Sequence, residues 1–206
     1  MIELIGLCKS FDEKVILKDF SLRIEDGEFV VITGKSGCGK TTLLNMIGGL
    51  EPADAGEILV DGIDILKRRN KMAYFQKKVG FLFQNFALVD TKTVRENMEM
   101  IYRRSRSEVG FTAALEQVGL ADRIDTKVYK LSGGEQQRVA LARLMVKKCD
   151  IILADEPTGA LDEGNARLVL HILQELNRMG RTVVMVTHAR ELVRGIGRNV
   201  ELECKE

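Results

Sequence analysis

The chain has 206 residues, of which 45% are apolar and 30% charged, with 31 basic against 30 acidic side chains. This balance excludes an intrinsically disordered chain and a strongly basic nucleic-acid binder, and the length suits a single globular domain, 1–206. The apolar runs stay far below the roughly 20 residues of a membrane-spanning helix, and no apolar leader follows a basic start. We therefore expect a cytoplasmic protein with no membrane span of its own and no nucleic-acid partner.

In chain order, residues 2–61 hold short β-type runs at 15–17, 22–24, 29–33 and 58–60, separated by glycine turns. These runs predict mostly antiparallel strands. Residues 85–130 are charged and favour helices, which predicts a helical lobe that extends to about residue 147. A helix from about Glu135, a strand at Ile151, a helix that ends before Gly180 and a strand at Thr182 follow. This alternation predicts an α/β fold with a parallel sheet.

A phosphate-binding loop is predicted directly after the apolar run 29–33. The motif G-x-x-x-x-G-K-[ST] permits backbone N–H groups to surround a phosphate at a helix N-terminus. The lysine of the motif would reach the β- and γ-phosphates, the first threonine hydroxyl would bind Mg²⁺, and the second threonine would contact the α-phosphate. The alternative is a glycine turn that caps a helix. The loop residues are Gly34, Lys35, Ser36, Gly37, Cys38, Gly39, Lys40, Thr41 and Thr42.

Polar side chains also follow three other apolar runs. Asp155 and Glu156 come directly after a buried strand, where Asp155 would hold Mg²⁺ and Glu156 would act as the general base for a water. Gln84 and His188 each follow an apolar run as well. Taken alone, either would be a satisfied surface or loop residue. Because ligands of open α/β sheets lie at the carboxyl ends of strands, we expect Asp155, Gln84 and His188 to converge with Gly34.

A second glycine-rich nest opens the helix near Glu135, within the sequence LSGGEQQRVALAR at 131–143. A serine hydroxyl, free N–H groups and a helix dipole would bind an anion there, and a plain helix N-cap is the alternative. The segment resembles the signature motif of the ATP-binding-cassette (ABC) ATPases, and the resemblance covers essentially the whole chain. It implies the P-loop ABC fold: a mixed or parallel core sheet, an N-terminal antiparallel β subdomain and a helical signature subdomain.

The resemblance further implies a head-to-tail dimer with two ATP molecules between two copies of the chain. Each ATP and its Mg²⁺ would lie between the phosphate loop of one copy and the signature residues of the other, which are Ser132, Gly133, Gly134, Glu135 and Gln136. By the same motifs, Phe11 would stack on adenine and His188 would contact the γ-phosphate. Gln84 would act in catalysis and at the metal, next to the membrane partner. Asp162 would communicate across the dimer.

Family resemblance also implies a function: an ATPase subunit that is peripheral to the inner face of the membrane and powers a separate integral membrane permease. Residues 157–162 are similar to the subgroup for macrolide efflux, lipoprotein release, bacteriocin export and cell division. Export of a bacteriocin or antimicrobial peptide, a lipoprotein or a drug is the leading expectation. Mechanical transmission to an extracytoplasmic partner and a non-transport ABC ATPase remain as alternatives. The segment 195–202 is short compared with the closing strands of the family.

The four cysteines, at positions 8, 38, 149 and 204, are scattered with no C-x-x-C pair, which indicates reduced thiols. Cys38 stands where the family more often has serine. We expect it to lie in an exposed nest at a helix N-terminus that favours the thiolate, so that a maleimide would block the site. The alternative is a shielded thiol that fills space.

Overall fold

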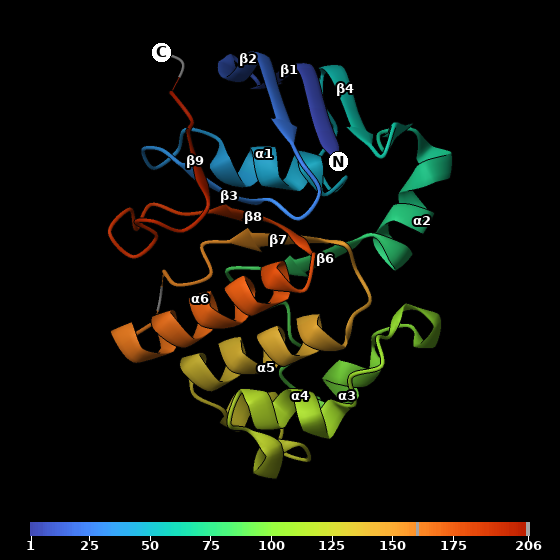
Figure 1. Ribbon diagram of the computed structural model, residues 1–206, viewed down its shortest axis with the longest axis vertical. Helices are drawn as coiled ribbons and strands as arrows, with labels where there is room; N and C mark the ends of the chain where they lie inside the picture. Colours follow the sequence, from blue (N-terminus) through green and yellow to red (C-terminus); the bar gives the residue numbers. More distant parts are fainter. Residues whose placement is uncertain (160, 205–206) are drawn as a thin grey trace.

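The computed structural model describes residues 1–159 and 161–204 as two β-sheets and a set of helices in layers (Figure 1). Among these residues, no helix is both long enough and apolar enough to cross a bilayer. The strands are β1 (Ile2–Phe11), β2 (Lys14–Ile24), β3 (Phe29–Thr33), β4 (Ala55–Val60), β5 (Ile63–Asp64), β6 (Val79–Leu82), β7 (Ile151–Asp155), β8 (Thr182–Val186) and β9 (Arg198–Glu201). The helices are α1 (Lys40–Ile47), α2 (Arg68–Lys77), α3 (Val94–Glu99), α4 (Phe111–Gln117), α5 (Gly133–Val146) and α6 (Glu163–Arg178), with 3-10 turns at Arg103–Ser105, Ala121–Arg123 and Val128–Lys130.

The central sheet has the order β6-β7-β8-β3-β9, and every neighbouring pair in it is parallel. Its inner strands β3, β7 and β8 are buried along their whole length, as expected for strands covered on both faces. The carboxyl ends of β3, β6, β7 and β8 therefore meet at one edge. This arrangement confirms the α/β fold class that the sequence predicts.

The second sheet is antiparallel, with the order β2-β1-β4-β5. Two details of the N-terminal prediction were wrong. The run Phe29–Thr33 is not antiparallel: it enters the central sheet because its five buried residues need cover on both faces. The runs 15–17 and 22–24 belong to the single strand β2, which continues through Asp19 in a left-handed conformation (φ 52°) where the register with β1 shifts.

Two hydrophobic cores fill the two faces of the central sheet. Adjacent residues of one strand serve opposite cores, because side chains alternate across a strand. On β7, Leu153 packs into the core shared with α1 and the antiparallel sheet, and Ala154 into the core shared with α5 and α6. Figure 1 shows this order of layers, with α1 above the central sheet and α5 and α6 below it.

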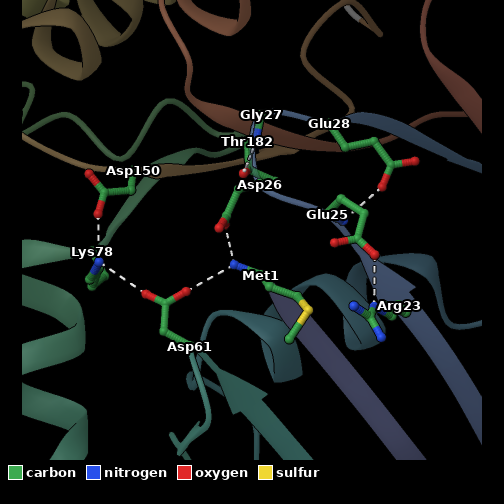
Figure 2. Close-up of polar contacts among 10 residues, drawn as sticks. All are labelled: Met1, Arg23, Glu25, Asp26, Gly27, Glu28, Asp61, Lys78, Asp150 and Thr182. Carbon is green, nitrogen blue, oxygen red and sulfur yellow. Dashed lines mark hydrogen bonds and ion pairs between the residues drawn. The ribbon is translucent and has the colours of Figure 1, made fainter.

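At the amino edge of the central sheet, a chain of charged groups connects the two sheets (Figure 2). Lys78, directly before β6, donates to Asp150 at 2.7 Å and pairs with Asp61 at 3.1 Å. Asp61 follows β4 of the antiparallel sheet, and Asp150 precedes β7 of the central sheet. The amino group of Met1 also pairs with Asp61, at 2.9 Å. These half-exposed pairs link the sheets at the edge opposite to the polar strand ends.

Candidate active site

The phosphate loop runs from β3 into α1, with the side chains of Lys35 and Ser36 exposed. Gly39 caps α1 with a φ of +92°, and a Cβ atom there would lie 2.3 Å from the Cγ2 atom of Ile16. Only glycine satisfies both conditions. The close approach of Ile16, on β2, also places the β1–β2 hairpin against the loop, and Phe11 is the last residue of β1 in this hairpin.

The side chain of Lys40, the lysine of the phosphate loop, is held by backbone carbonyl groups of the same loop. Its Nζ atom donates to the carbonyl oxygens of Gly34 at 3.0 Å and Lys35 at 2.9 Å, and the side chain is buried. These carbonyls fix the ammonium group beneath the loop before any anion arrives. A positioned cation and the N-terminus of α1 together form the anion site that the motif predicts.

Thr41 and Asp155 meet across the edge of the sheet. The Oγ1 atom of Thr41 donates to Oδ1 of Asp155 at 2.9 Å. Burial raises the pKa of Asp155 above its usual value, and the charge of Glu156 acts in the same direction, whereas the Thr41 hydrogen bond and the charge of Lys40 oppose the shift. A hydroxyl and a desolvated carboxylate are hard oxygen ligands, so the pair fits Mg²⁺ bound jointly with phosphate oxygens.

Glu156 and His188 form a pair that sequence reasoning missed. The Nδ1 atom of His188 lies 2.9 Å from Oε1 of Glu156, and the backbone N–H of His188 donates to Oε2 at 3.2 Å. Glu156 has a left-handed backbone (φ 43°), a strained conformation that its N–H bond to the Val186 carbonyl helps to hold. The only signal in the sequence was that both residues follow neighbouring strands.

The second nest stands at the start of α5. Ser132 caps the helix: its Oγ atom accepts from the N–H of Glu135 at 3.3 Å, and its own N–H donates to the Glu135 carboxylate at 2.8 Å. This backbone bond lowers the pKa of Glu135. Ser132 and Gly133 are exposed, and Gly134 and Glu135 are half-buried. The nest is thus open to solvent, with no phosphate loop of its own on the same element.

A family model described as "ABC transporter" matches residues 17–159, which include the phosphate loop, the second nest and the Asp155–Glu156 strand end. The chain belongs to the ABC transporter family. Membership confirms the resemblance inferred from the motifs. The chain is therefore an ATP-binding cassette ATPase.

Relatives of this cassette include longer proteins. It is 41% identical to the macrolide export ATP-binding/permease protein MacB of Campylobacter jejuni, over all of this chain but only 33% of MacB. It is 40% identical to the methionine import ATP-binding protein MetN of Clostridium acetobutylicum, over 98% of this chain and 65% of MetN. Among solved structures, the dimeric ATP-binding cassette MJ0796 bound to ADP and Pi matches with a TM-score of 0.86 and 36% identity, covering 100% of this chain and 97% of MJ0796.

The other predicted residues of the cassette are placed as follows. Gln84 is exposed two residues beyond β6, whose neighbour in the sheet is β7. Phe11 is 45% exposed at the end of β1, with the Lys9 ammonium 4.8 Å from its ring centroid. Thr42 is half-buried in the first turn of α1. The sheet edge brings Gln84 to the side of Asp155, and the role of each residue toward ATP stays a prediction.

Two predicted dimer residues bind within their own chain. Asp162 caps α6 by accepting from the N–H of Asn165 at 2.9 Å, which lowers the pKa of Asp162. Gln136 points inward, and its Nε2 atom donates to the carbonyl of Leu131 at 3.1 Å. Gln136 thus braces the segment in front of α5, whereas the exposed Ser132 is free to meet a second copy.

The expectation that Cys38 lies exposed and favours the thiolate was wrong. Its side chain is only 3% exposed, and burial raises the pKa of the thiol, although the charge of Lys40 opposes the shift. The loop backbone faces outward at Lys35 and Ser36, while the Cys38 sulfur turns under it toward Lys40, 3.9 Å from the Nζ atom. In its burial, the reduced Cys38 thiol matches the alternative of a shielded thiol.

Proposed function

We propose that this cassette hydrolyses ATP at a composite site completed by a second copy, and so drives a separate membrane permease from the cytoplasmic side. One observation carries the proposal: the phosphate loop, Asp155 and the Glu156–His188 pair share one sheet edge, while the nest at Ser132 is exposed at the start of another element, α5. In a head-to-tail dimer, Ser132, Gly133, Gly134 and Glu135 would close over the ATP of the partner. The dimeric form of MJ0796 supports this arrangement.

Each side chain has a proposed task. Lys40 would bind the β- and γ-phosphates, and Thr41 and Asp155 would hold Mg²⁺, with Gln84 as a further ligand near the permease. When bound, Mg²⁺ would neutralise phosphate charge and orient the terminal phosphate. Glu156 takes the proton of the attacking water, while His188 fixes its carboxylate and reaches toward the γ-phosphate. Phe11 stacks on adenine, and Asp162 links the two sites.

For the cargo, we propose export: a bacteriocin or other antimicrobial peptide, a lipoprotein or a drug. The likeness to MacB supports this direction, and the similar likeness to MetN makes import the rival. Residues 85–147 would carry the permease contact and the signature nest as one helical lobe. Mechanical transmission without cargo is the second candidate, because residues 157–162 also resemble those of the subgroup that includes cell-division proteins.

The first test is Glu156→Gln. We expect unchanged ATP affinity, turnover reduced by about 10²-fold or more, and a dimer that persists with ATP, because the proton acceptor is lost while every phosphate contact stays. Single-turnover ATPase assays and light scattering measure these effects. Normal turnover in the variant would refute the base assignment.

A tagged Glu156→Gln protein would also trap the partner. Purification from its own cells in mild detergent, followed by mass spectrometry, should recover an integral membrane permease. The extracytoplasmic domains of this permease would narrow the range of possible cargo molecules. Recovery of ribosomal or DNA-bound proteins alone would contradict the transport proposal and leave the ATP chemistry intact.

A further inference from the structure

The phosphate loop has a neighbour that the family motifs do not include. Strand β9 pairs in parallel with β3, with Glu201 opposite Thr33, and the N–H of Leu202 donates to the Thr33 carbonyl at 2.7 Å. The chain that follows β9 therefore runs beside the start of the loop. Cys204 lies in this segment and is exposed.

Packing around Gly34 shows how close the two segments are. A Cβ atom at Gly34 would lie 2.5 Å from the Leu202 carbonyl oxygen and 2.7 Å from the Cys38 sulfur. The sulfur and the segment after β9 therefore press against the same side of Gly34. Cys204 stands two residues further on, and after burial it is one of the groups that raise the pKa of Cys38.

We propose that Cys38 and Cys204 form a reversible disulfide that lowers the ATP affinity of the cassette under oxidising conditions. The oxidant is a hydroperoxide. The exposed Cys204 thiolate attacks the peroxide oxygen and becomes a sulfenic acid with release of water, or of an alcohol from an organic peroxide. The Cys38 sulfur then attacks the Cys204 sulfur, loses its proton and expels a second water. Two thiols are thereby oxidised and one peroxide is reduced.

The Lys40 ammonium serves the second step, because a cation 3.9 Å from the Cys38 sulfur stabilises the attacking thiolate. The other two cysteines are placed differently. Cys8 donates to the Gly6 carbonyl on β1, and Cys149 is buried beside Arg181 at the amino edge of the central sheet. The two thiols at the phosphate loop are therefore the pair that the fold presents for oxidation.

The effect on ATP rests on the proposed function of the loop. The Cys38 N–H donates to the Lys35 carbonyl at 3.3 Å, so Cys38 helps to shape the nest. A disulfide requires about 3.5–4.5 Å between the two Cβ atoms, which draws Cys38 toward β9 and away from Lys40. Loss of one charge-assisted bond to phosphate weakens binding by about tenfold, and this is the loss we expect.

Peptide mapping tests the bond itself. The full chain is treated with hydrogen peroxide, alkylated and digested with trypsin. We expect the peptide 36–40 linked to the peptide 199–205, at a mass about 2 Da below the sum of the two, and its disappearance after reduction. The cross-link should be absent from Cys204→Ser and present in Cys8→Ser. Oxidised protein without this link would overturn the proposal, whatever its ATPase activity.

ATP binding tests the consequence. Oxidised wild-type protein should bind ATP about tenfold more weakly than the reduced form, with recovery after dithiothreitol, and oxidised Cys204→Ser should bind like reduced protein. Equal affinity of cross-linked and reduced protein would overturn the regulatory role. If reduced wild-type protein fails to bind ATP, the proposed function fails instead, and the peptide map still decides whether the bond forms.

Discussion

Asp155 lies in a partly buried environment that disfavours its charged form. Burial raises its pKa above the usual value, so the folded protein binds a proton at this carboxyl more readily than the unfolded chain does. The free energy of unfolding therefore falls as pH rises from the usual carboxyl pKa through the raised one. Above that window, the charged carboxylate reduces the stability of the ligand-free fold. A Mg²⁺ ion with ATP would remove this penalty.

Asp155→Asn should consequently raise the melting temperature of the ligand-free protein at pH 7 by about 1–3 °C, because it removes a buried charge and keeps the side-chain volume. The same variant should lose the thermal shift that Mg²⁺-ATP gives the wild type. Differential scanning fluorimetry measures both effects. A lower melting temperature than the wild type at pH 7 would contradict the argument.

His188→Ala tests the role of the His188 ring in positioning the Glu156 carboxylate. Without the ring, the carboxylate keeps one backbone N–H bond and loses its side-chain partner, so we expect turnover to fall by about 10²-fold with little change in stability. Steady-state ATPase assays give the effect. His171→Ala is the matched control, since His171 is exposed on α6, and it should retain wild-type turnover.

At the scale of elements, two helices begin in the same way. Ser132 with Glu135 starts α5, and Thr93 with Glu96 starts α3, each by a reciprocal capping box. Such a cap stabilises a protein by about 1 kcal/mol. One box lies in the nest that we assign to the partner's ATP and the other does not, so they form a natural comparison.

Ser132→Ala and Thr93→Ala should each lower the free energy of unfolding by about 1 kcal/mol in urea titrations. ATPase activity should fall further in Ser132→Ala, because its hydroxyl would also bind phosphate. Equal activity in the two variants would show that Ser132 serves only as a helix cap.

The sequence predicts the features that depend on a local pattern, and it does not predict those that depend on contacts between distant segments. The loop at Gly34, the strand end at Asp155 and the parallel β7–α6–β8 unit follow from local pattern, because glycine spacing and apolar runs fix them. The burial of Cys38 did not follow, since the segment after β9 that covers it lies about 160 residues away in the chain. The Glu156–His188 clasp likewise depends on the neighbouring positions of β7 and β8.

At the scale of the whole molecule, the dimer can be tested at Gly133. A side chain there meets nothing within 4 Å inside the chain, so Gly133→Arg should fold and bind ATP. Combined with Glu156→Gln, it should block the ATP-dependent dimer, because the arginine would fill the space of the partner's phosphate. Light scattering with and without ATP gives the result.

Gly110→Arg in the same background is the control. Gly110 likewise stands at the start of a helix, as the N-cap of α4, and a side chain there also meets nothing within 4 Å. This variant should still dimerise. A Gly133→Arg protein that dimerises as well would contradict the head-to-tail arrangement.

The alternation of the two cores along β7 gives the sheet a mechanical property. Leu153 is gripped from the side of α1, Ala154 from the side of α5 and α6, and Asp155 follows at the end of the same strand. Because both faces of β7 are packed, the strand is rigid, and the catalytic carboxylates lie at its carboxyl end. A force applied to α5 and α6 should therefore move β7 and Asp155 together. The mechanical coupling between the helical layer and the catalytic residues would then run through this one strand.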